Sequence, residues 1–330
     1  AQVIQTPRHL TKMTSSKAFK LGATAQTRLT YTSSSKKVAT VNKTSGKVKI
    51  KGAGVTTITV RAQESEDYTS AAATIKLRVL DMEGTDGGSE RIVYTLDTGN
   101  CTAVASLTGD GGVHVPQAIA YTGKKYIVAY CNGKGSTNTR IITFDKKGNK
   151  LAVDSCSWNH PNGFTYCEKT GLCYALRGNS AEVYVYNPKK REFGTTYMSY
   201  GAAGIAYDRA LELIYTTSQT GVRTYSGDGN FSHQQLMSNC SHSGYTYTQD
   251  CGAYNGLVFR CMSGSSKHGL NYVDIYDTRT SEYLGSFAAY LGELESAFVN
   301  ENGDLMILAN NSSRTDYIWN THINVKSLSE

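Results

Sequence analysis

The stretch NGFTYCEKTGLCYAL, residues 162–176, contains the pattern that decides the fold of the larger part of this chain. A small residue precedes a short strand of alternating apolar and aromatic residues. The polar turn EKTG follows, and a second apolar strand completes the unit. Alternation of this kind on both sides of a Gly-containing turn predicts a β-hairpin.

The same pattern recurs along the chain. It begins again at Gln117, Ala203, Ser243 and Glu295, so that successive units start 45, 41, 40 and 52 residues apart. A third strand and, in most units, a recognisable fourth follow each pair, as in EVYVYN and then REFGTTY. Four strands repeated about every 40–45 residues indicate β-propeller blades, and five units predict a five-bladed propeller. Residues 91–107 are expected to complete the last blade. A β-sandwich or irregular all-β domain is the alternative, because the repeats are divergent.

Charge divides the chain into two domains. The 330 residues carry a net charge of +7. Residues 1–80 hold 14 Lys and Arg against 3 Asp and Glu, whereas residues 81–330 hold 20 against 24. The Gly-rich, acidic stretch DMEGTDGGSE reads as a linker. We therefore predict an all-β chain with a first domain at 1–80, a linker at 81–90 and a second domain at 91–330.

The first domain has the features of a small β-sandwich. Alternating segments such as KVKIKG and TIKLRVL each place one face in a core and one in water. The string SSSKKVATVNKTSGKVKIKGAGVTTITVRA followed by DYTSAAATIKLRVL resembles the bacterial Ig-like domains of group 2. That resemblance implies a spacer or presentation module of secreted and cell-surface proteins. The exposed lysines are expected to form a solvated face, with attraction to cell-wall polyanions as the alternative.

All eight cysteines lie in the second domain. Next to an extracellular module they predict a disulfide framework, with free structural thiols as the alternative. Cys167 and Cys173 flank one hairpin turn and are the best candidate pair. Neither a CxxC motif nor a zinc-ribbon spacing occurs, so we expect no metal. A nucleophilic cysteine assisted by His114, His160 or His242 needs a free thiol, which an oxidising location disfavours.

The second domain carries little that indicates catalysis. The first residues of the expected inner strands are Gln117, Asn162, Gly204, Gly244 and Glu295. Only one is a carboxylate, whereas glycoside hydrolysis needs two, so Glu295 is the sole glycosidase candidate. Asp208 and Asp250 are expected to start turns. With no nucleophile elbow, zincin motif or P-loop, we predict a protein without cofactor that is not an enzyme.

The loops between the predicted blades point to recognition instead. Tyr and Trp among Ser, Gly and Asn are typical of protein-binding surfaces, and the same rings can stack on sugars. Packing between blades is the alternative for each aromatic residue, and a loop hydrogen bond for each histidine. The candidate ligand-binding residues are His114, Trp158, His160, Tyr197, Tyr200, His242 and Tyr290.

Domain order and composition together are similar to the immunoglobulin-binding, superantigen-like surface proteins of gut Firmicutes. That resemblance implies a secreted or cell-surface adhesin that recognises a host glycoprotein, with the heavy-chain variable region of immunoglobulin as the leading candidate. A lectin-like propeller, a glycoside hydrolase and a structural cap are the alternatives. Nucleic acid is not expected, because lysines and aromatic residues lie in different domains. Membrane insertion is not expected either, because no run approaches 18 apolar residues.

Overall fold

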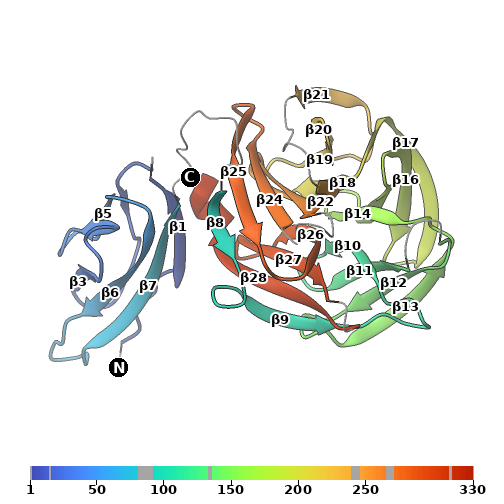
Figure 1. The fold of residues 1–330 in the computed structure, drawn as a ribbon. Coiled ribbons are helices and arrows are strands. Elements are labelled where there is room, and N and C mark those ends of the chain that lie inside the picture. Colours follow the sequence, from blue (N-terminus) through green and yellow to red (C-terminus); the bar gives the residue numbers. More distant parts are fainter. Residues whose placement is uncertain are drawn as a thin grey trace. The chain divides into compact units, whose positions relative to one another are not determined.

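The computed structural model describes residues 2–14, 16–80, 92–132, 136–238, 246–264, 271–311 and 314–329. Their regular secondary structure is almost entirely β-strand, with one short helix (Figure 1). The chain divides into two compact units: unit 1 comprises residues 1–87 and 323–330, and unit 2 comprises residues 88–322. The sequence-based boundary places 323–330 with the second domain instead. The predicted linker, 81–90, lies outside the described residues.

Two sheets build unit 1, and their facing side chains share one core that includes Tyr31, Val48, Ile58 and Ile75. One sheet has the order β1-β7-β6-β3 and the other β2-β5-β4. The strands are β1 (His9–Met13), β2 (Phe19–Lys20), β3 (Leu29–Ser33), β4 (Ala39–Val41), β5 (Lys47–Ile50), β6 (Gly54–Ala62) and β7 (Ala71–Leu80). Seven described strands in two sheets agree with the predicted small β-domain.

Residues 323–330 return to unit 1 and end in helix α1 (Val325–Ser329). Ser327 Oγ donates a hydrogen bond of 2.6 Å to the Thr11 carbonyl and accepts one of 2.8 Å from the Thr11 N–H. The Asn324 N–H donates to Thr11 Oγ1 at 3.1 Å. Both Thr11 and Ser327 are buried. The segment 323–330 is therefore joined to β1 by buried polar groups that all have hydrogen-bond partners.

The described part of unit 2 forms five successive sheets, each with a core of four antiparallel strands (Figure 1). The first sheet contains β10 (Pro116–Tyr121), β11 (Tyr126–Cys131), β12 (Thr139–Phe144) and β13 (Lys150–Cys156). The second contains β14 (Pro161–Cys167), β15 (Leu172–Arg177), β16 (Ser180–Asn187) and β17 (Glu192–Ala202). The third contains β18 (Gly204–Asp208), β19 (Leu213–Ser218), β20 (Gly221–Ser226) and β21 (His233–Ser238).

The last two sheets also take in strands from the start of unit 2. The fourth contains β22 (Thr246–Tyr254), β23 (Leu257–Gly264), β24 (Asn271–Asp277), β25 (Glu282–Ala289) and, parallel to β25, β8 (Ile92–Leu96). The fifth contains β26 (Glu293–Val299), β27 (Asp304–Asn310), β28 (Asp316–Asn324) and β9 (Thr102–Leu107). The prediction that residues 91–107 complete the last sheet is confirmed for β9, whereas β8 joins the fourth sheet.

The first strands of the five sheets contact one another in a closed series, β10 to β14, β18, β22, β26 and back to β10. Glycines allow this close approach. A Cβ on Gly163 would lie 2.7 Å from the Ala203 carbonyl oxygen, and one on Gly204 would lie 2.9 Å from the backbone of Asp250. Only a residue without a side chain fits at these crossings. The small residues of the repeats therefore have a packing role.

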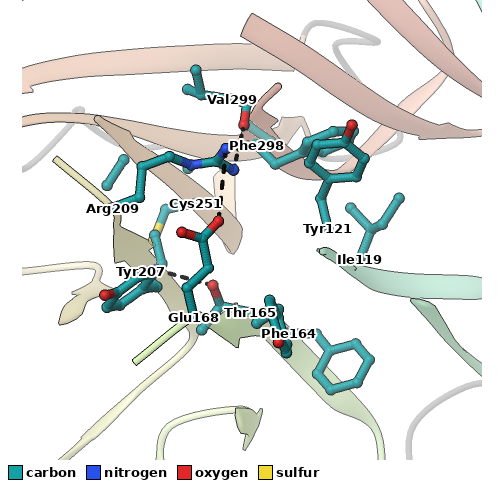
Figure 2. Close-up of a pocket in the computed structure, with 15 residues that line it drawn as sticks. Ile119, Tyr121, Phe164, Thr165, Glu168, Tyr207, Arg209, Cys251, Phe298 and Val299 are labelled. Atoms are coloured by element: carbon teal, nitrogen blue, oxygen red, sulfur yellow. Dashed lines mark hydrogen bonds and ion pairs between the residues drawn. The ribbon is translucent and has the colours of Figure 1, made fainter. Parts of the chain in front are cut away.

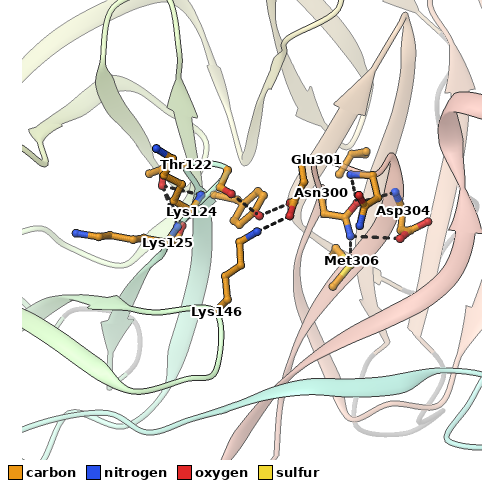
Figure 3. A network of polar contacts seen from close by, with 12 residues as sticks. Thr122, Lys124, Lys125, Lys146, Asn300, Glu301, Asp304 and Met306 are labelled. Carbon is orange, nitrogen blue, oxygen red and sulfur yellow. Dashed lines mark hydrogen bonds and ion pairs between the residues drawn. The ribbon is translucent and has the colours of Figure 1, made fainter.

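Polar side chains join the first sheet to the last at the turns between their strands (Figure 3). Glu301 accepts hydrogen bonds from the Tyr121 hydroxyl and from Lys146 Nζ. Burial opposes ionisation of this carboxyl, but the Lys146 and Tyr121 hydrogen bonds outweigh it and lower the pKa of Glu301. The contact supplements the apolar core shared by the two sheets, which includes Tyr130 and Leu308.

The predicted Cys167–Cys173 disulfide is wrong. Cys167 lies opposite Leu172 and Cys173 opposite Tyr166, so the two cysteines point to opposite faces of the sheet. Cys167 packs in the core toward the third sheet, and Cys173 in the core toward the first. Among the described residues, Cys156, Cys167, Cys173, Cys251 and Cys261 have free thiols, and Cys240 lies outside these residues.

Candidate functional site

Four of the five inner strands are interrupted near their beginning by a bulge or register shift that falls on polar residues. The shifts lie between Pro116 and Ala118, Pro161 and Gly163, Thr248 and Cys251, and Leu294 and Ser296. The residues at these shifts are Gln117, Asn162, Gln249 with Asp250, and Glu295. Because a bulge redirects a side chain out of the regular alternation, these polar groups can occupy a region of apolar strands.

Two of the bulge residues, Gln117 and Glu295, are buried. Gln117 Nε2 donates to the carbonyls of Pro116 and Cys131 at 3.1 and 3.4 Å. Glu295 is buried, and desolvation followed by the charge of Glu293 raises the pKa of its carboxyl well above the ordinary value. Both effects favour the uncharged form of this carboxyl.

Asn162 and Gln249 line a cavity of about 500 Å³ at the start of the inner strands of the second, third and fourth sheets. Asn162 Nδ2 donates to Gln249 Oε1 at 3.3 Å, and Gln249 Nε2 donates to Ser263 Oγ at 3.1 Å. The buried atoms Asn162 Oδ1 and His160 Nδ1 have no hydrogen-bond partner. The cavity wall therefore retains unused capacity to bind a ligand. Its lining residues are Asn159, His160, Asn162, Arg177, Gly178, Asn179, Ala203, Gln219, Tyr247, Thr248 and Gln249.

A buried thiol lies behind this wall. Cys131 Sγ is 3.5 Å from the Ser136 carbonyl oxygen, and the thiol also interacts with Thr139 and His160. Burial raises the pKa of the Cys131 thiol, but hydrogen bonds with His160, Thr139 and Ser136 outweigh it and lower the pKa to about 7. His160 holds a positive φ of 46°, a conformation uncommon outside glycine. The sequence allowed for a Cys–His pair, and the structure places Cys131 beside His160.

The other ends of the inner strands surround only a small space (Figure 2). Its volume is about 30 Å³, roughly the room for one water molecule. Arg209 extends across it, with Nη2 donating to the Val299 carbonyl at 3.3 Å and Nη1 lying 3.8 Å from Glu168 Oε1. This end is therefore closed, and the candidate site is the larger cavity at the opposite end.

The aromatic candidates separate into two groups. Trp158 was expected at a ligand-binding surface, but it is buried and belongs to a core cluster. Its ring stacks on that of Tyr184, with the ring centroids 4.9 Å apart. In contrast, Tyr197, Tyr200 and Tyr290 expose 69%, 49% and 54% of their surface. The Arg223 guanidinium lies 4.5 Å from the centre of the Tyr200 ring, a cation–π contact.

The histidine candidates differ as well. His160 lines the cavity. His114 is half-buried within a loop, where its Nδ1 lies 3.0 Å from the Gly112 carbonyl oxygen. The backbone N–H of His114 donates a hydrogen bond to Asn132 Oδ1. His242 lies outside the described residues.

Sequence reasoning missed Tyr247 and Gln249 in the cavity. It placed the start of that inner strand at Gly244, which lies outside the described residues, whereas the strand β22 begins at Thr246 and its register shift falls after Thr248. The segment YTYTQD, residues 245–250, belongs to the repeat that starts at Ser243, but alternation alone gives no sign of a bulge.

The two aspartates expected in turns also differ. Asp208 does start a turn, accepting hydrogen bonds from the N–H groups of Ala210 and Leu211. The expectation that Asp250 starts a turn is wrong. This residue is buried within β22 and accepts hydrogen bonds from strands β14, β18 and β26.

A profile of the intimin immunoglobulin-like domain matches residues 16–64. The match supports a bacterial Ig-like domain in this segment. A domain of this type suggests a surface-exposed bacterial protein. None of the curated proteins compared with the chain matches it. Among the described residues, no helix is long and apolar enough to span a membrane, and no group of three His, Cys, Asp or Glu side chains is arranged to hold a metal.

The solved structures that match the chain include an enzyme and a phage protein. The glutaminyl cyclase of Myxococcus xanthus aligns with a TM-score of 0.50 and 11% identity, over 66% of this chain and 95% of that one. A tail fiber of Staphylococcus aureus phage P68 aligns with a TM-score of 0.48 and 9% identity, over 68% and 52%. The share aligned with the cyclase exceeds what unit 1 could supply, so the similarity lies mainly in unit 2.

This comparison corrects the expectation that the chain is not an enzyme. A solved structure with a similar fold belongs to an enzyme, so the architecture gives no ground for excluding catalysis. At 11% identity the similarity describes the fold and transfers no activity or site residue.

Proposed function

We propose that unit 2 is a five-bladed β-propeller presented at the bacterial surface by the Ig-like unit, and that it recognises a host glycoprotein. The expected partner is immunoglobulin, through its heavy-chain variable region. Five sheets whose first strands contact one another in a closed series support the propeller. The intimin-type match supports display at the surface.

The exposed tyrosines carry the proposal for protein recognition. Most aromatic rings of unit 2 are packed in cores, but Tyr197 and Tyr200 on β17 and Tyr290 stand in solvent. Tyr and Arg are enriched among residues that dominate protein interfaces, because they bury much area at little conformational cost. The Tyr200–Arg223 pair brings both residue types to one surface position.

Surface plasmon resonance against pooled immunoglobulin tests this function. The unmodified chain is expected to bind, and the double substitution Tyr197→Ala with Tyr200→Ala is expected to weaken binding at least about 30-fold, as loss of hot-spot residues does. Tyr247→Ala is the matched control, since Tyr247 is 68% exposed but lines the cavity. No signal at micromolar concentration would overturn the proposal.

A second candidate is a carbohydrate ligand in the cavity. Amide, imidazole and guanidinium groups beside the exposed Tyr247 ring match the hydroxyl groups and apolar faces of a neutral sugar. On a glycan array, Tyr247→Ala and Gln249→Ala are expected to abolish the signal, whereas the Tyr197 and Tyr200 substitutions leave it unchanged. The two sets of variants therefore separate protein recognition from sugar recognition.

A further inference from the structure

The outer face of one sheet of unit 1 carries cations and hydroxyl groups side by side. In the register of this sheet, His9 of β1 lies opposite Lys76 of β7, and Lys76 lies opposite Thr57 of β6. Thr74 is two residues from Lys76 and shares its face, while Ile75 between them is in the core. Three neighbouring strands thus contribute to one polar row about 10 Å wide.

This row borders an open groove of about 610 Å³. Arg8 and Lys76 are exposed, so both charges are available at its edge. Thr6 also lines the groove, and its buried Oγ1 has no hydrogen-bond partner. The complete lining consists of Ile4, Thr6, Arg8, His9, Thr57, Ala73, Thr74 and Lys76.

No carboxylate of the first domain offsets the charge of the groove. Within the described residues 2–14 and 16–80, the carboxylates are confined to one segment, as Glu64, Glu66 and Asp67, and none of them lines the groove. With 14 basic residues in residues 1–80, the potential at this face is positive and attracts anions.

We infer that this groove binds a phosphate-bearing polymer of the bacterial cell wall, a chain of polyols joined by phosphodiester groups. Arg, Lys and Thr side chains are the usual partners of phosphodiester oxygens. Apart from the imidazole of His9, the groove lining contains no ring on which a nucleic-acid base could stack, and no Phe, Tyr or Trp, which favours a polymer without bases. Such binding would hold the protein at the wall independently of the ligand of unit 2.

Binding of the full chain to immobilised polyglycerol phosphate tests the inference. We expect binding at about 50 mM salt that weakens steeply at about 200 mM, as phosphate contacts do. The double substitution Arg8→Gln with Lys76→Gln is expected to weaken binding at least about tenfold by removing two charged hydrogen-bond donors. The control is Lys47→Gln with Lys49→Gln, which removes the same charge from exposed residues of β5 in the other sheet.

Each outcome decides the question. A larger loss for the Arg8 and Lys76 pair than for the Lys47 and Lys49 pair supports the groove. Equal losses would show attraction by net charge alone and overturn it, as would no binding at about 50 mM salt. Equal or tighter binding to heparin or single-stranded DNA would overturn the assignment to a wall polymer. Unchanged immunoglobulin binding by both double variants separates this test from that of the proposed function.

Discussion

Ser296 Oγ donates a hydrogen bond of 2.6 Å to Asp250 Oδ2, joining the inner strands β26 and β22. The same carboxyl accepts the N–H groups of Phe164 at 3.2 Å and Ile205 at 3.0 Å, from β14 and β18. One buried side chain therefore connects four of the five sheets of unit 2. Burial raises the pKa of Asp250 to about 8, although the hydrogen bonds oppose it.

The raised pKa of Asp250 predicts a pH-dependent stability. The folded state holds this proton more tightly than the unfolded chain, whose aspartate pKa is about 3.9. The contribution is therefore complete below about pH 4 and is lost as the pH rises toward about 8. Asp250→Asn removes the titration, and its unfolding free energy is expected to change less than that of the parent between about pH 5 and pH 8.

Denaturant unfolding at several pH values measures this difference. The Asn variant is also expected to be about 1–3 kcal/mol less stable at low pH, because its NH₂ group faces a backbone N–H. Parallel pH profiles for the two proteins would contradict the assignment to Asp250.

The buried ion pair Arg260–Asp274 is expected to be sensitive to loss of one partner. Its atoms lie 2.7 Å apart, and both side chains are fully buried. Asp274→Ala leaves the Arg260 charge buried, so a loss of about 3–5 kcal/mol in unfolding free energy is expected. Asp277→Ala is the matched control: its partner Arg279 also lies 2.7 Å away but is 41% exposed, and a loss of about 1 kcal/mol or less is expected. Similar losses in both variants would show that burial does not set the cost.

The Cys131 thiol is expected to titrate near neutral pH, whereas burial raises the pKa of Cys156 to about 11. Iodoacetamide labelling followed by peptide mass spectrometry over a pH series gives each midpoint. His160→Asn tolerates the positive φ but lacks the imidazole, so it should shift the Cys131 midpoint upward. The same midpoint in parent and variant would show that His160 does not lower the pKa.

Trp158 is expected to contribute to stability rather than to binding. Its ring packs against Tyr184, Phe164 and Phe193. Trp158→Ala should cost about 3–5 kcal/mol in unfolding free energy, as removal of a buried aromatic ring does. Tyr290→Ala, at a 54% exposed position, should change stability by about 0.5 kcal/mol or less. A thermal unfolding series measures both, and a stable Trp158→Ala protein would contradict the packing.

Repeating patterns made the strands predictable. In residues 162–176 the small residue, the turn and the two apolar runs each have a local cause, and the structure has β14 and β15 there. The same holds for the first part of β7, where burial alternates as far as Leu77. Local sequence also marks turn residues such as Asp208, whose carboxylate accepts N–H groups two and three residues further on.

The parts that were missed depend on contacts between distant segments. Asp250 resembles a turn residue in sequence, but its partners are 46, 45 and 86 residues away. The register shift before Cys251 moves Gln249 into the cavity, and alternation does not reveal such shifts. The Cys167–Cys173 pairing failed for a simpler reason, since the register of the hairpin separates the two side chains by the thickness of a sheet.

The return of residues 323–330 to unit 1 has a mechanical consequence. The chain enters unit 2 from unit 1 and comes back to it, and the Thr11–Ser327 contacts fasten that second crossing. A protease cut within residues 81–91 would therefore leave two fragments that remain associated in native buffer and separate only in denaturant. A pulling force on unit 1 would likewise be divided between the two chain segments that connect the units, one after residue 87 and one after residue 322.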